Sequence, residues 1–270
     1  MKKIIPAHVN DKPGSIIQDN PTHSVNKLHA RINPFVRFCG CMWFSIQKPF
    51  LSRRISKPSI EFIDDVPLLS LPGVLSAVVF RGGEFLAQTV ANHECAAPPQ
   101  TTSCPLALDM GTGSGAGAIF AARRGYQVIG VDINPQAVRC ARVNVLLNNL
   151  EDKIEIREGD LFSPVTDQRF HLVLFNPPFY EGEPRSLSDL AWRSTDVIER
   201  FAAGLSNVLA ADGLAMILLS TDGSADGMLK ALTVHGFFVE PIISRHFGNE
   251  IMAIYSARLI NTEGKTSSSP

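Results

Sequence analysis

Residues 106–132 decide the fold, and they read LALDMGTGSGAGAIFAARRGYQVIGVD. The apolar run 106–110 is typical of a buried strand, and a glycine-rich turn, a helix of small residues and a second apolar run follow it. The glycines of the turn have no Cβ, so the backbone can turn tightly and a ligand can lie directly against it. They are Gly111, Gly113 and Gly115.

The turn differs from two common nucleotide-binding loops. It contains no Lys followed by Ser or Thr, which excludes a P-loop. It matches the dinucleotide fingerprint only in a tolerated variant, with Ala116 in place of the third glycine, so a nicotinamide enzyme is the less favoured interpretation. Asp132 ends the second strand, where a carboxylate can accept hydrogens from both hydroxyls of a ribose.

Two further motifs follow at the ends of later strands. They are Gly159-Asp160-Leu161-Phe162 and Asn176-Pro177-Pro178-Phe179. With the glycine turn and Asp132, this order resembles the class I S-adenosylmethionine-dependent methyltransferases over roughly residues 68–259. The resemblance implies an α/β fold, a doubly wound, seven-stranded and mostly parallel sheet of the Rossmann-like methyltransferase type, here with an N-terminal extension.

The resemblance also implies S-adenosyl-L-methionine as cofactor and assigns residues to it. Asp160 stands where the family's acid accepts the exocyclic amine of adenine, and Leu161 and Phe162 would contact the ring. The segment before the glycine turn lies over the cofactor in this family, and Glu84 is a candidate acid there, although a carboxylate in a first helical turn is equally explained by the helix dipole. The cofactor-binding residues implied are Asp109, Gly111, Thr112, Gly113, Gly115, Asp132, Ile133, Asp160, Leu161 and Asn176.

The Asn-Pro-Pro-Phe motif indicates the acceptor atom. An amide or base amine nitrogen is a poor nucleophile because its lone pair is delocalised, so acceptors must hold its hydrogens. The side-chain oxygen of Asn176 and the carbonyl of Pro177 can take those hydrogens, and Phe179 offers a face on which a planar group can stack. We therefore expect Asn176, Pro177 and Phe179 to be the catalytic residues.

Several acceptors fit this motif. It resembles the amino-methyltransferases, and the run 106–180 is most similar to protein-glutamine methyltransferases of the release-factor type and their small-domain relatives. Adenine-N6 or guanine-N2 methylation of RNA or DNA is an alternative. A small-metabolite methyltransferase and a non-catalytic S-adenosylmethionine-binding module are the others.

The composition is that of a globular protein, with 45% hydrophobic residues and a net charge of -1. Residues 1–60 carry ten Lys or Arg against two Asp, and such a basic head can contact an acidic or nucleic-acid partner. The five cysteines lack the spacing of a zinc site or a disulfide framework. There is no signal-peptide pattern and no apolar run that spans a membrane, so we expect a cytoplasmic protein.

Four regions are expected along the chain. Residues 1–57 form a basic, partly irregular extension, 58–103 form strands and a helix that cover the cofactor, 104–260 form the methyltransferase domain, and 261–270 are a tail. Within them the pattern predicts short strands over 60–63 and over 68–79, the latter broken at Pro72-Gly73. It also predicts a helix over 189–209, and a final strand pair over 237–244 and 251–259 as an antiparallel edge.

Overall fold

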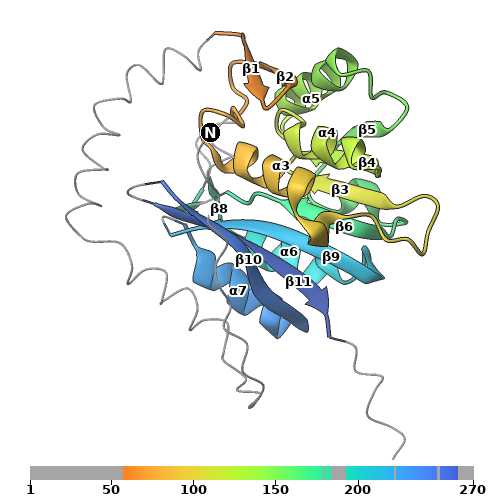
Figure 1. Cartoon of the computed structure of the whole chain (residues 1–270). Helices are drawn as coiled ribbons and strands as arrows, with labels where there is room; N and C mark the ends of the chain where they lie inside the picture. The colour runs from red at the N-terminus through yellow and green to blue at the C-terminus, as the bar shows by residue number, and fades with distance from the viewer. Residues whose placement is uncertain (1–56, 179, 184–192, 222, 248–249, 261–270) are drawn as a thin grey trace, which may run out of the picture.

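The structure, a computed structural model, describes residues 57–178, 180–183, 193–221, 223–247 and 250–260. A seven-stranded sheet lies between two layers of helices (Figure 1). The predicted N-terminal extension up to residue 56, Phe179 and the tail 261–270 lie outside the described residues.

The sheet has the strand order β10-β11-β9-β6-β3-β4-β5. Neighbouring strands from β9 to β5 pair in parallel, whereas β11 is antiparallel to both β9 and β10. This confirms the predicted doubly wound, mostly parallel sheet. The strands are β3 (Leu106–Met110), β4 (Gln127–Asp132), β5 (Ile154–Glu158), β6 (Phe170–Phe175), β9 (Leu209–Ser220), β10 (Phe237–His246) and β11 (Ile251–Leu259).

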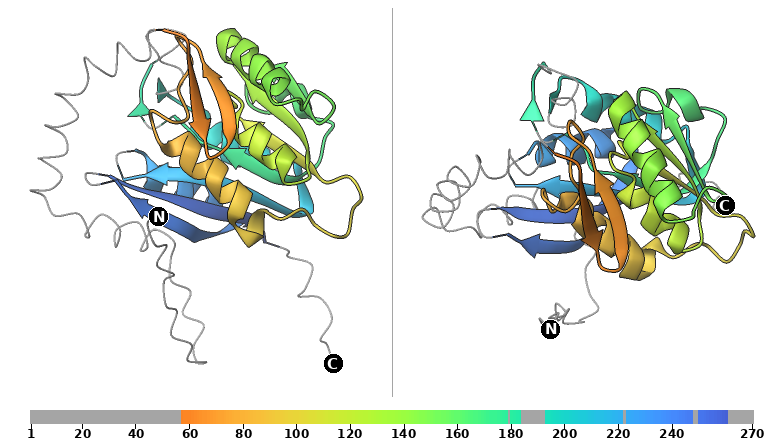
Figure 2. Two further views of the ribbon diagram at one scale, coloured as in Figure 1. Left: turned by 45° about the horizontal axis from the view of Figure 1, so that its top comes forward. Right: turned by 90° about the horizontal axis from the view of Figure 1, so that it is seen from above.

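The helices cover both faces of the sheet, as the two views in Figure 2 show. On one face lie α3 (Gly82–Asn92), α4 (Ala116–Arg123) and α5 (Pro135–Leu147), and on the other lie α6 (Val197–Leu205) and α7 (Ala225–Val234). Short 3-10 helices, η1 (Glu94–Ala96) and η2 (Ser163–Val165), join neighbouring elements.

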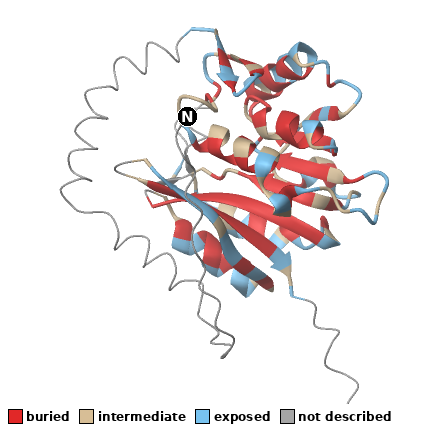
Figure 3. Ribbon diagram, in the orientation of Figure 1, coloured by how far each residue is buried: buried red, intermediate tan, exposed pale blue. Residues whose placement is uncertain are grey.

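The continuous apolar strands are explained by burial on both faces (Figure 3). Along β6, Leu172 and Leu174 pack into the core under α3 and α4, and the alternate residues Val173 and Phe175 pack into the core under α6 and α7. The period of two along a strand thus distributes one run of side chains between two cores.

A hairpin of β1 (Ser59–Ile63) and β2 (Val66–Ser70) lies beside α5. The fully buried amide of Asn144 on α5 pairs with β2 as a neighbouring strand would: its Oδ1 accepts from the Leu69 backbone N–H (2.6 Å), and its Nδ2 donates to the Leu69 carbonyl (2.9 Å). The same Nδ2 donates to the carbonyl of Ser114 in the glycine turn (2.8 Å). Asn144 therefore joins the hairpin to the glycine turn.

The remaining strands are the short parallel pair β7 (Tyr180–Glu181) and β8 (Arg193–Ser194).

Two predicted elements differ from the structure. The helix predicted for 189–209 is wrong in its bounds, because α6 ends at Leu205. The apolar spacing of the sequence extends beyond the helix, since Val208 is buried in a turn and Leu209 is buried in β9. The strand structure predicted over 68–79 ends at Ser70, and the rest is a loop. The predicted antiparallel edge is confirmed: β10 and β11 pair antiparallel at one end of the sheet, with β10 outermost.

No helix in the described part of the chain combines the length and the apolar character needed to span a bilayer.

We predict that Asn144→Ala lowers the free energy of unfolding by about 3 kcal/mol, because it leaves buried backbone groups of Leu69 and Ser114 without partners. Urea denaturation of the purified protein measures the change. Arg139→Ala, at an exposed position on the same helix, should change the free energy by less than about 0.5 kcal/mol. Equal effects of the two substitutions would show that Asn144 does not tie the hairpin to the core.

Candidate functional site

A cavity of about 340 Å³ lies at the carboxyl ends of the parallel strands. The chain leaves β3 toward β4 and β5 on one side and later returns to β6 on the other side, so the strand order reverses between β3 and β6. Open α/β sheets bind ligands at such a reversal. The cavity is lined by the loops after β3, β4, β5 and β6, by the loop 73–80, and by residues at the start of α6.

The glycine turn forms one wall of the cavity. Gly111, Gly113 and Gly115 have φ values of 65°, 57° and 85°, in the left-handed region that glycine adopts without strain. A Cβ on Gly111 or Gly113 would meet no atom closer than 3.9 Å, so the space beside the backbone is open. Gly115 does not line the cavity. It packs against α5 instead, since a Cβ on Gly115 would lie 3.3 Å from Ala141.

Asp109 holds the glycine turn from beneath. Its side chain is buried, and its Oδ2 accepts from the hydroxyl of Thr112 (2.6 Å) and from the backbone N–H of Ala118 (2.8 Å). Burial raises the pKa of Asp109 to about 6, although both hydrogen bonds oppose the rise. Asp109 and Thr112 border the cavity, but their polar atoms are bound to each other.

Asp132 connects the glycine turn to the loop after β4. Its Oδ2 accepts from the Gly113 backbone N–H (2.8 Å) and its Oδ1 accepts from the Asn134 backbone N–H (2.9 Å). Burial raises the pKa of Asp132, and the backbone hydrogen bonds oppose this. Each carboxylate oxygen has a second lone pair, so Asp132 can still accept from a ligand. The neighbouring Ile133 lines the cavity and is 46% exposed.

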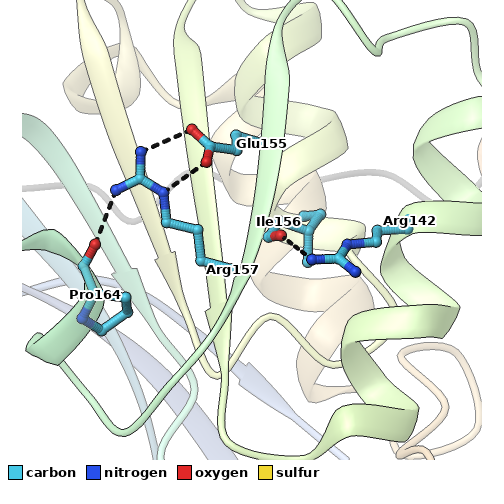
Figure 4. A network of polar contacts seen from close by, with 5 residues as sticks. All are labelled: Arg142, Glu155, Ile156, Arg157 and Pro164. Atoms are coloured by element: carbon cyan, nitrogen blue, oxygen red, sulfur yellow. Dashed lines mark hydrogen bonds and ion pairs between the residues drawn. The ribbon is translucent and has the colours of Figure 1, made fainter.

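The turn after β5 brings Asp160 and Leu161 to the cavity wall. Leu161 has a positive φ of 47°, a strained backbone for a non-glycine residue. Figure 4 shows how the turn is held: Arg157 binds both carboxylate oxygens of Glu155 (2.8 and 2.7 Å) and donates to the carbonyl of Pro164 (2.8 Å), which follows the turn. Asp160 also pairs with Arg200 of α6.

Asn176 lies at the opposite end of the site, directly after β6. Its Oδ1 is buried and has no hydrogen-bond partner within the described part of the chain. The first turn of α3 packs against it, since a Cβ on Gly82 would lie 3.5 Å from Nδ2. Asn176 and Pro178 line the cavity. Pro177 is buried and does not line it, so the cavity's shape gives no support to an acceptor role for the Pro177 carbonyl.

The segment before the glycine turn, expected from the sequence to cover the cofactor as strands, forms a wall of the cavity as the loop 73–80. Ser76 in this loop is 1% exposed, donates from its hydroxyl to Glu61 of β1 (2.5 Å) and accepts from the backbone N–H of Val79 (3.0 Å).

Glu84, a candidate from the sequence, does not line the cavity. Burial raises the pKa of Glu84, with Arg245 opposing the rise.

Comparison with known proteins agrees with this geometry. Residues 65–233 match the family model described as the methyltransferase small domain. The chain belongs to this family. Its fold and its glycine turn are those of class I methyltransferases, and this class uses S-adenosylmethionine as methyl donor.

Two curated relatives and one solved structure are similar to the chain. A ribosomal RNA small subunit methyltransferase C from Alcanivorax borkumensis is 30% identical over 59% of this chain and 44% of the relative. A putative protein N5-glutamine methyltransferase from Methanocaldococcus jannaschii is 34% identical over 49% of this chain and 71% of the relative. The chain thus spans less than half of the first protein. Trm5 from M. jannaschii, solved in complex with adenosine, has the same fold, with a TM-score of 0.51, 17% identity, and coverage of 75% of this chain and 56% of Trm5.

The cavity fits a nucleoside with a charged side chain. Its volume is in the range of small-molecule sites, and open backbone at Gly111 and Gly113 leaves room that a Cβ would fill. The buried oxygen of Asn176, which follows the neighbouring strand β6, calls for a donor that the described residues do not supply.

We predict that the free-energy difference between wild type and Asp109→Asn depends on pH. The pKa of Asp109 is about 6 in the folded protein and 3.8 in the unfolded chain, so the folded state binds the extra proton between these values. The resulting stabilisation is complete below pH 3.8 and is lost as the pH rises through 6. The unfolding free energy of wild type minus that of Asp109→Asn should therefore fall by about 2.4 kcal/mol from pH 4 to pH 7.

Urea denaturation at a series of pH values tests this expectation on the ligand-free protein. Asp152→Asn removes a carboxylate from an exposed position and controls for the change in net charge. A difference that stays constant or rises over this range would contradict the buried, proton-binding state of Asp109.

Proposed function

We propose that the protein is an N-methyltransferase that transfers the methyl group of S-adenosylmethionine to a planar nitrogen, and that this nitrogen is the side-chain amide of a protein glutamine. The observation that carries the proposal is the buried, unpartnered Oδ1 of Asn176 beside the glycine turn. A buried acceptor without a donor costs about 1–3 kcal/mol, and an amide N–H of the substrate would remove that cost.

The residues of the cavity fit this cofactor. The carboxylate of Asp132 would accept from the ribose, and that of Asp160 from the adenine amine, while Ile133 and Leu161 would supply apolar contact to the base. The bound sulfonium supplies a methyl group that is already activated for transfer. The open backbone at Gly111 and Gly113 would lie against the ligand.

Asn176 would orient the acceptor nitrogen. Its Oδ1 would hold an amide hydrogen and direct the nitrogen lone pair toward the methyl group, and the two prolines that follow stiffen the turn so that this geometry exists before substrate binds. The ionisable residues among the described lining residues are Asp109, Asp132, Asp160, Asp196 and Arg200, none of which belongs to this turn. This fits a reaction that needs no strong base before transfer, because the nitrogen can lose its proton afterwards.

Two observations favour a protein acceptor over RNA. The relative covered over most of its length is named for protein glutamine, and residues 61–270 carry 24 acidic against 15 basic residues, a balance that disfavours a polyanion. RNA remains the second candidate, because one relative is named for ribosomal RNA and residues 1–60 are basic.

We predict that Asn176→Ala lowers kcat at least 100-fold and changes the Kd for S-adenosylhomocysteine by less than about fivefold, because the substitution removes an interaction with the acceptor. Asn207→Ala, an exposed amide outside the cavity, is the matched control and should retain full turnover. Calorimetry and single-turnover assays measure the two effects. Turnover of Asn176→Ala within a few fold of wild type would refute the role of Asn176.

The acceptor class can be identified directly. The full chain is incubated with cell extract and a donor labelled in its methyl group, and samples are digested separately with protease and nuclease. We expect protease to release the label, exhaustive enzymatic digestion to yield N5-methylglutamine, and acid hydrolysis to release the label as methylamine. Nuclease-sensitive label would support the RNA alternative, and donor binding without any transferred label would support a non-catalytic module.

A further inference from the structure

An ion pair lies in the wall of the cavity at the end opposite Asn176. Asp160 Oδ2 accepts from Nη2 of Arg200 at 2.5 Å, and Nη1 of Arg200 lies 3.7 Å from Asp196. All three residues line the cavity. Within the described part of the chain, Asp160 Oδ1 has no donor. One oxygen of this carboxylate is therefore occupied, and the other is available to a ligand.

The position of Arg200 follows from the packing of the next residue. Phe201 is fully buried and stacks on Phe175 (centroids 4.2 Å apart, planes at 24°) and on Phe162 (5.4 Å, 29°). Phe175 comes directly before Asn176, and Phe162 is two residues after Asp160. The stack fixes the rotation of α6 about its axis, and this rotation turns Arg200 toward Asp160.

The distance between α6 and the Asp160 turn is also fixed. Gly204 lies one helical turn after Arg200, and a Cβ there would lie 2.6 Å from the Phe162 ring, so only glycine allows this approach. On the other side, Arg157 holds the turn through Pro164 (Figure 4). The ion pair thus joins two backbones that are held by packing, and its side chains are partly open to solvent, with Arg200 45% and Asp160 44% exposed.

We infer that Arg200 is a specificity-determining residue for the base of the cofactor, an inference that rests on the proposed function. Arg200 holds one oxygen of Asp160 so that the other faces the cavity as an acceptor. An exocyclic amine, as in adenine, donates to that oxygen. A carbonyl in the same place, as in hypoxanthine, meets the carboxylate with like partial charge, while the guanidinium of Arg200 is paired with Asp160 and Asp196.

Two ligands that differ at this position test the inference. Calorimetry gives Kd values for S-adenosylhomocysteine and S-inosylhomocysteine with the full-length protein. Wild type should bind the adenine compound at least 20-fold more tightly. Arg200→Met should weaken the adenine compound about fivefold to tenfold and leave the hypoxanthine compound nearly unchanged, which reduces the ratio. Asp160→Asn should reduce the ratio further, because the amide can donate to a carbonyl.

Two further variants separate specificity from folding. Arg200→Lys keeps the charge without the planar fork and should give an intermediate ratio. Arg123→Met breaks the exposed pair with Asp65 outside the cavity and should leave the ratio unchanged. The thermal unfolding of every variant is measured in parallel, and the ratio is compared only between folded proteins, with Arg200→Lys deciding if Arg200→Met does not fold.

Two results would overturn the inference: tighter binding of the adenine compound by Arg200→Met, or an unchanged ratio in that variant, as when both ligands are weakened equally. Each differs from failure of the proposed function, in which wild type binds neither nucleoside. A wild type that binds S-adenosylhomocysteine while the ratio is insensitive to Arg200 would remove the role of Arg200 and leave the proposed function intact.

Discussion

The site depends on one buried carboxylate, that of Asp109 at the end of β3. It accepts hydrogens from Thr112 in the glycine turn and from Ala118 in α4, and so it fixes both the turn and the start of the helix. Burying a carboxylate is unfavourable, which is why its pKa rises to about 6. The contact is also tight: a Cβ on Gly117 would lie 2.5 Å from Asp109 Oδ1, so the helix can approach only with glycine at that position.

A second carboxylate extends this arrangement to the next strand. Asp132 binds the backbone of Gly113 and Asn134, so the loops after β3 and β4 are connected by a side chain that also borders the cavity. The two acids therefore differ in role. Asp132 is held by backbone donors and lines the cavity, whereas Asp109 supports the glycine turn from the interior.

The walls of the cavity come from elements outside the βαβ core. Asn144 connects the β1–β2 hairpin to the glycine turn, and the loop that follows the hairpin covers one side. On the other side, Phe201 stacks between Phe162 and Phe175 and so attaches α6 to the strands that carry Asp160 and Asn176. The apolar stack thus couples the two ends of the site through one helix.

The sequence by itself determined the parallel sheet, the glycine turn and the polar residues at the strand ends, because apolar runs and glycines report local backbone geometry. Nine of the ten residues predicted for the cofactor line one cavity. Gly115 differs, since it packs on Ala141. Only the tertiary structure decided the end of α6 at Leu205, the loop conformation of the wall segment 73–80, the place of β11 inside the sheet, and the pairing of Arg200 with Asp160. These features join segments far apart in the chain, and no local period of the sequence carries information about which distant surfaces pack together.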